Sequence, residues 1–161
     1  MRKIYLAIFA LIILSACNPK PSKLQSNIAM KEKGLMVHAK AGKVDTTEVN
    51  ALIKDYITYS DSYNNDTMGA EYLFKAADFY RYMHQPVRCI DLYSKVYDRY
   101  PSFSRRPYAL FLQGFILENE VKNNTGAKTI YEKFLKEYPT HPIAKDVQIT
   151  LNNRVKSPEE L

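Results

Sequence analysis

The feature that most constrains the fold of this chain is a stretch, residues 69–139, that carries nearly the same pattern twice. Both copies end in a Tyr-Pro pair, at residues 100–101 and 138–139, which are 38 residues apart. The Leu-Phe pairs of the earlier halves, at 73–74 and 110–111, are 37 residues apart, so the second copy holds one extra residue. We place this residue in the loop 120–124. A period of this size is typical of stacked helical pairs.

The spacing of apolar residues predicts six helices between residues 45 and 161. In the first of them Val49, Leu52, Ile53 and Tyr56 fall at i, i+3, i+4 and i+7, which places them on one helix face. The predicted helices cover residues 46–62, 68–83, 87–100, 107–117, 127–138 and 141–155. Antiparallel succession and short connections make this an all-α domain, a short α-solenoid of helix pairs.

The doubled pattern resembles the tetratricopeptide repeat, a family of helix pairs. That motif has a large apolar residue, a small residue four places on, another large residue, then a second small residue, an aromatic one and a final proline. The matching positions are Leu73, Ala77, Tyr80, Cys89, Tyr93 and Pro101 in one copy and Leu110, Gly114, Leu117, Ala127, Tyr131 and Pro139 in the other. The resemblance implies two repeats, about 69–102 and 106–139, with the helices 46–62 and 141–155 as caps.

The resemblance also implies a groove lined by the first helix of each repeat. The groove-facing places would be Glu71, Phe74, Asp78, Arg81, Tyr108, Phe111, Phe115 and Glu118. If Tyr108, Phe111 and Phe115 are exposed together, they form an apolar strip that suits a peptide or a helix. If the capping helices cover them, they belong to the core instead.

The N-terminus has the order of an export signal. A positive start, Arg2 and Lys3, is followed by the eleven apolar residues Ile4–Leu14, which are too few to cross a bilayer core of about 30 Å. The next residues resemble the lipobox of bacterial lipoproteins, with Leu14, Ser15 and Ala16 as recognition residues and Cys17 as the lipid-bearing thiol. An ordinary signal peptide that ends near a cysteine is the alternative. Residues 1–16 are therefore predicted to be a lipoprotein signal peptide.

Residues 17–44 are predicted to be a lipid-anchored flexible tether. This segment contains two prolines, two serines, two glycines and six lysines but no sustained apolar period, and such a composition buries too little apolar surface to offset its ordering entropy. Two apolar islands, Ile28–Met30 and Leu35–Val37, could dock on the body or form short helical turns. The six lysines could rest on anionic headgroups or simply be solvated. Asn18, which follows the cysteine, favours the outer membrane under the sorting rule known for this class.

Charge and chemistry exclude several functions. The net charge of +6 belongs to the first 44 residues, because residues 45–161 hold fifteen basic and sixteen acidic side chains. A nucleic-acid partner would need a basic folded surface. His38, His84 and His141 lie apart, and Cys89 occupies a small-residue place in the repeat. We therefore expect neither an enzyme, a metal site, a cofactor nor a small-molecule substrate.

The expected function is that of a protein-interaction scaffold in the bacterial cell envelope. A lipid anchor would attach the protein to the outer membrane, on the side that faces the periplasm. Its partner would be another envelope protein or a peptide segment. Lipobox and repeats together are distantly similar to the lipoprotein subunit of the outer-membrane β-barrel assembly machinery. The alternative is an accessory, architectural subunit of outer-membrane protein assembly or of an envelope uptake complex.

Overall fold

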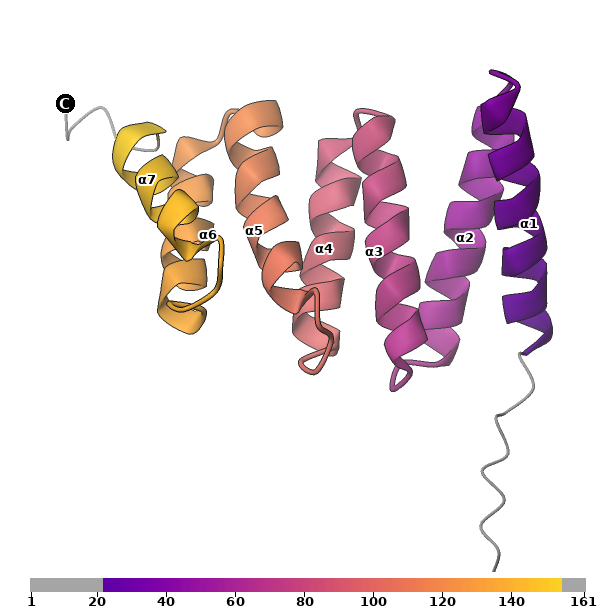
Figure 1. Cartoon of the computed structure of the whole chain (residues 1–161), viewed down its shortest axis with the longest axis horizontal. Helices are drawn as coiled ribbons and strands as arrows, with labels where there is room; N and C mark the ends of the chain where they lie inside the picture. Colours follow the sequence, from indigo (N-terminus) through magenta and orange to yellow (C-terminus); the bar gives the residue numbers. More distant parts are fainter. Residues whose placement is uncertain (1–21, 155–161) are drawn as a thin grey trace, which may run out of the picture.

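The computed structural model describes residues 22–154, and every regular element in that range is a helix. The predicted signal peptide and Cys17 lie outside the described residues. The α-helices are α1 (Lys23–Lys40), α2 (Thr46–Ser62), α3 (Thr67–Tyr82), α4 (Pro86–Arg99), α5 (Arg106–Ile116), α6 (Asn124–Glu137) and α7 (Ala144–Arg154), with a π-helix, η1 (Leu117–Val121), after α5. They stand in a row, each packed on the next, with α1 at one end and α7 at the other (Figure 1). The predicted all-α solenoid is confirmed. No helix among the described residues is long and apolar enough to cross a membrane.

The prediction of a flexible tether is wrong for Lys23–Lys40. This segment forms α1, which packs against α2 and buries Ile28 completely. Glu32 of α1 accepts hydrogen bonds from the Tyr56 hydroxyl of α2 (2.6 Å) and from the Lys75 ammonium of α3 (2.8 Å). Tertiary contacts of this kind order a helix whose own composition is weakly apolar.

The extra residue of the second repeat lies within a helix and not in the loop 120–124 alone. His84 ends α3 in a left-handed conformation (φ 53°), and Lys122, 38 positions later, does the same after η1 (φ 62°). The amide of Gln85 donates to the carbonyl of Tyr80, whereas the amide of Asn123 reaches one residue further, to Leu117. The π turn of η1 therefore absorbs the insertion.

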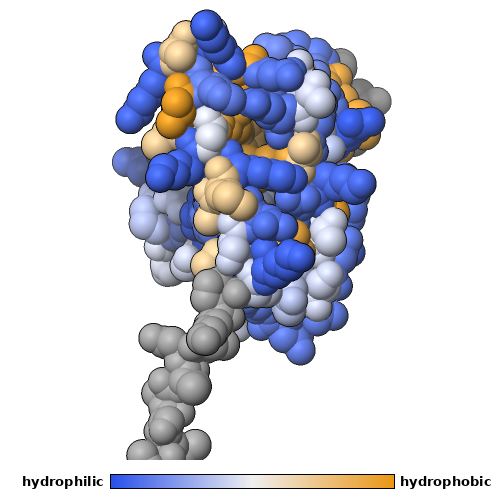
Figure 2. Space-filling model, turned by 90° about the vertical axis from the view of Figure 1, so that its right-hand side faces the viewer, coloured by the Kyte–Doolittle hydropathy of each residue, from blue (hydrophilic) through white to orange (hydrophobic). Residues whose placement is uncertain are grey.

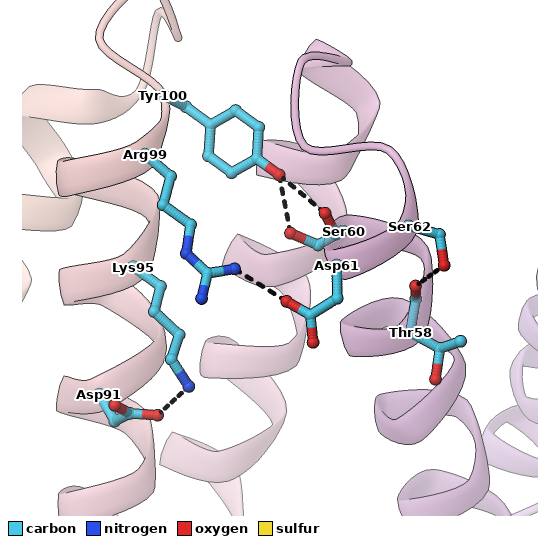
Figure 3. Close-up of polar contacts among 8 residues, drawn as sticks. All are labelled: Thr58, Ser60, Asp61, Ser62, Asp91, Lys95, Arg99 and Tyr100. Carbon is cyan, nitrogen blue, oxygen red and sulfur yellow. Dashed lines mark hydrogen bonds and ion pairs between the residues drawn. The ribbon is translucent and has the colours of Figure 1, made fainter.

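Tyr100, from the first Tyr-Pro pair, joins the end of α4 to the end of α2. Its hydroxyl lies 2.7 Å from the Ser60 hydroxyl, and both side chains are buried (Figure 3). A Cβ atom at Gly69, the third residue of α3, would lie 2.7 Å from the same hydroxyl, so only glycine leaves room for it. Beside this contact Arg99 of α4 pairs with Asp61 of α2 at 2.8 Å.

The same three places recur one pair further along the row. The positions that correspond to Ser60, Gly69 and Tyr100 lie 37 or 38 residues later and hold, in that order, Tyr97, Arg106 and Tyr138. Arg106 donates to the Tyr138 hydroxyl and to the Tyr97 carbonyl, and its guanidinium lies 4.0 Å from the Tyr97 ring. Because α2 holds the place that α4 holds in the next pair, α2 is the second helix of an additional pair, α1–α2. The helix expected over 46–62 is therefore more than a cap.

Candidate functional site

The predicted groove residues of α3 lie on one side of that helix but are held by neighbouring side chains. Glu71 forms an ion pair with Arg105, and Phe74 is buried beneath the same guanidinium, 4.1 Å from its ring centroid. Asp78 accepts a hydrogen bond from the Tyr93 hydroxyl at 2.6 Å, and Arg81 lies 3.8 Å from the same carboxylate. Glu71, Phe74 and Asp78 therefore connect α3 to the chain that follows it, whereas Arg81 pairs within α3. Phe74 is buried, but the side chains of Glu71, Asp78 and Arg81 remain 33%, 34% and 38% exposed.

The predicted groove residues of α5 and η1 divide between core and surface. Tyr108 and Phe115 are 39% and 37% exposed, whereas Phe111 between them is half-buried, with its ring centroid 6.1 Å from that of Tyr131. Glu118 is buried and accepts a hydrogen bond from Tyr131 at 2.9 Å. The two exposed rings are thus separated by a ring packed on α6, and the apolar strip is interrupted.

A second apolar surface lies at the other end of the row, in a cleft between α1, α2 and α3. The cleft has a volume of about 510 Å³. Its apolar walls are Leu35, Met36, Val44, Leu52, Phe79 and Tyr82, and its polar groups are Glu32, Lys75 and Asp78. Figure 2 looks onto the α1 end of the molecule and shows hydrophobic surface recessed between hydrophilic side chains. Asp78 also belongs to the predicted groove, so the cleft adjoins it.

Tyrosine and phenylalanine rings make the floor of the cleft rigid. The ring of Tyr56 stacks on Tyr72 with centroids 5.0 Å apart and on Phe79 at 6.5 Å. Burial, reinforced by the hydrogen bond to Glu32, raises the pKa of Tyr56 far above its ordinary value, so this hydroxyl stays protonated. The rim is open by contrast, because Met36 is 61% and Tyr82 78% exposed.

The charges in the cleft are already neutralised within the protein. Burial works against the ionised form of Glu32, but hydrogen bonds from Lys75 and Tyr56 and the charge of Lys75 outweigh it and lower its pKa. The Lys75 ammonium also lies 5.9 Å and 5.7 Å from the rings of Tyr56 and Tyr72. With its polar groups paired, the cleft suits an apolar side chain of a partner.

This cleft does not follow from the sequence pattern, because one of its walls, α1, was expected to be a tether. Two signals for the helix were present. Ser22 and Gln25 form a capping box, in which the serine hydroxyl accepts from the Gln25 amide and the glutamine side chain accepts from the Ser22 amide. Ile28 and Leu35 are seven residues apart, two helical turns, and both face α2.

Among the described residues, potential metal ligands lie apart and the one thiol, that of Cys89, is buried. Within residues 22–154 no three His, Cys, Asp or Glu side chains lie close enough to hold a metal ion. The Cys89 thiol is fully buried and donates to the Ala77 carbonyl at 3.1 Å, and burial raises its pKa to about 12. A thiol of this kind is a packing residue, because the reactive thiolate is strongly disfavoured.

Comparison with known families identifies one repeat. Residues 108–141, which span α5, η1 and α6 almost completely, match the family model of the tetratricopeptide repeat. The chain therefore contains a tetratricopeptide repeat, a module that typically binds proteins and is typically non-catalytic. No curated protein matches the chain.

The variant Glu32→Gln should lower the free energy of unfolding by about 1–2 kcal/mol at neutral pH, since the amide carries no charge to pair with Lys75. The pKa of Glu32 is lower in the folded state than its ordinary value of 4.5. Its stabilisation is therefore complete above that pH and is lost as the pH falls through the lowered folded-state value. Urea unfolding of both proteins across this range measures the difference.

The matched control is Asp91→Asn, which removes the pair between Asp91 and Lys95; the Asp91 side chain is 57% exposed, against 32% for Glu32. It should cost less than about 1 kcal/mol. If the free energies of unfolding of the wild type and of Glu32→Gln differed by the same amount at every pH, the role assigned to Glu32 would be contradicted.

Proposed function

We propose that this protein is a lipid-anchored scaffold of the bacterial cell envelope, whose helical solenoid holds a segment of a partner protein. The observation that carries the scaffold role is the apolar cleft between α1, α2 and α3, together with the tetratricopeptide repeat in α5–α6. A cleft of this size with an aromatic floor accepts one or two apolar side chains of a helix or an extended peptide. Its polar groups have hydrogen-bond or ion-pair partners within the protein, which favours binding over catalysis.

The anchoring part of the proposal rests on the order of residues before α1. The chain starts with a short positive segment, which is followed by an eleven-residue apolar run. This run leads directly into Leu14-Ser15-Ala16-Cys17. With several acyl chains on Cys17 the protein would be held firmly, because each buried methylene contributes roughly 0.8 kcal/mol. Asn18, the residue after the cysteine, favours sorting to the outer membrane, and the solenoid would then lie in the periplasm.

The position of α1 limits how far the solenoid could lie from an anchor at Cys17. Ser22, the N-cap of α1, follows Cys17 by only five residues. Even a fully extended chain of that length spans at most about 18 Å. An acylated Cys17 would therefore keep the first turn of α1 close to the bilayer surface, where the long flexible tether expected from the sequence would have let the body move away.

The anchor is tested by Cys17→Ala in cells that express the full chain. The wild type should sediment with the outer membrane and the variant should appear in the soluble periplasmic fraction, because the side chain that would carry the acyl anchor is lost. Cys89→Ala is the matched control and should stay with the membrane. Sedimentation of Cys17→Ala with the outer membrane to the same extent as the wild type would contradict the anchor.

The scaffold role is tested by a photoreactive amino acid placed at the rim of the cleft. At Met36 or Tyr82 it should form reproducible adducts with one envelope protein in intact cells. The same group at Ile149 of α7, which is also exposed, should not. The identity of the adduct separates a subunit of outer-membrane protein assembly from one of an uptake complex. Equal adducts from all three positions, or none from the rim, would contradict a partner in the cleft.

A further inference from the structure

We propose that the outer face of α1 is a docking surface for an anionic phospholipid bilayer, so that the solenoid stands on the membrane by its first helix. We define the outer face as the side turned away from α2, formed by Ser26, Met30, Lys33, Val37 and Lys40. These residues follow one another at intervals of four and three, so they lie along one stripe of the helix. All five are exposed.

The charge of this surface is positive and is not neutralised by the body. Two basic side chains at the edge of α1 are paired, Lys31 with Asp55 and His38 with Glu48. Four lysines of α1 and the turn after it form no ion pair with any residue of the range 22–154: Lys23, Lys33, Lys40 and Lys43. The single acid of α1, Glu32, faces inward to Lys75. Complementarity of charge therefore favours an anionic occupant.

The apolar residues of the stripe distinguish a bilayer from a free anion. Met30 and Val37 are 68% and 59% exposed and lie two turns apart, between the lysines. Figure 2 looks onto this end of the molecule and shows hydrophobic side chains set singly within a hydrophilic surface. Apolar residues interspersed with lysine are typical of helices that lie at a lipid interface, where the apolar groups enter the headgroup boundary. A soluble phosphate compound would use the charges and leave Met30 and Val37 in water.

The place of α1 in the row makes the contact sterically simple. α1 is the terminal helix, so no other described helix covers its outer face (Figure 1). Docking by this face would direct the row of helices away from the bilayer and put α7 farthest from it, with the cleft between α1 and α3 near the surface. The short distance from Cys17 to Ser22 agrees with this arrangement, and that part of the argument rests on the proposed function. The charge and the exposed stripe do not depend on it.

The test measures binding to vesicles without any acyl anchor. The chain from residue 17 onward, with Cys17→Ala, keeps every described residue. It is mixed with vesicles of equal parts phosphatidylglycerol and phosphatidylethanolamine, or of phosphatidylcholine alone, and bound protein is measured by sedimentation. Each lysine near an anionic surface contributes roughly fivefold to binding. The double variant Lys33→Glu/Lys40→Glu should therefore bind the anionic vesicles at least about 25-fold more weakly.

The matched control is Lys136→Glu/Lys145→Glu, which makes the same change of net charge on exposed positions of α6 and α7. It should bind as the unsubstituted chain does, and binding should fall as salt is raised. Met30→Ser/Val37→Ser, which keeps all charges, should also weaken binding. Circular dichroism checks that each variant keeps its helices.

Several results would overturn the proposal. These are equal binding to phosphatidylcholine, no binding to either vesicle, or equal loss in both charge-reversal variants. A protein adduct from a photoreactive group at Val37 in cells would show a protein surface instead. Failure of the lipid anchor is read separately, from the fractionation of Cys17→Ala, and leaves the vesicle result intact.

Discussion

The structure depends on one repeated interaction, a buried tyrosine hydroxyl that donates to a carboxylate on the preceding helix of its own pair. Tyr56 donates to Glu32 at 2.6 Å, Tyr93 to Asp78 at 2.6 Å and Tyr131 to Glu118 at 2.9 Å. The three tyrosines are fully or almost fully buried and stand 37 and 38 residues apart.

A buried hydroxyl without a partner would cost about 1–3 kcal/mol, so each tyrosine fixes the position of an acid, and with it the neighbouring helix. The ring supplies the apolar area that fills the interface, and the hydroxyl fixes the alignment of the two helices. Close approach also demands small residues nearby: a Cβ at Gly114 would lie 2.7 Å from the Tyr131 ring. One side chain thus accounts for both the packing and the register of each pair.

Most of the fold could be predicted from the sequence because the two matching repeats combine independent signals. Small residues, periodic apolar residues and the Tyr-Pro ends all indicate the same helices. The pair α1–α2 was not predicted because its residues depart from the repeat pattern. Ser60 and Gly69 occupy the positions that Tyr97 and Arg106 occupy one pair later, although a tyrosine hydroxyl is bound at both places. Helix α1 was not predicted because Gly34 and the lysines leave it only a small apolar face. The contacts of Glu32 with Tyr56 and Lys75, which help to order this helix, involve residues distant in the sequence and leave no local pattern.

The site was less predictable for the same reason. Seven of the eight predicted groove residues lie on α3 or α5 and Glu118 lies on η1, but the sequence does not reveal that Arg105 covers Phe74 or that Tyr131 donates to Glu118. The cleft needs α1 as a wall, and so could not be inferred while that segment was taken for a tether. The predicted groove and the cleft remain adjacent surfaces, which share Asp78.

The central claim is that Lys23–Lys40 is an integral helix of the solenoid and not a linker, since the cleft and the proposed docking surface for a bilayer both require it. Native-state hydrogen exchange of the wild-type chain at neutral pH tests this most directly. The account predicts that amides in the middle of α1, around Ile28 and Glu32, exchange far more slowly than in an unfolded peptide, with protection approaching that of α2. Exchange of the α1 amides at unfolded rates, while α3–α6 stay protected, would contradict it.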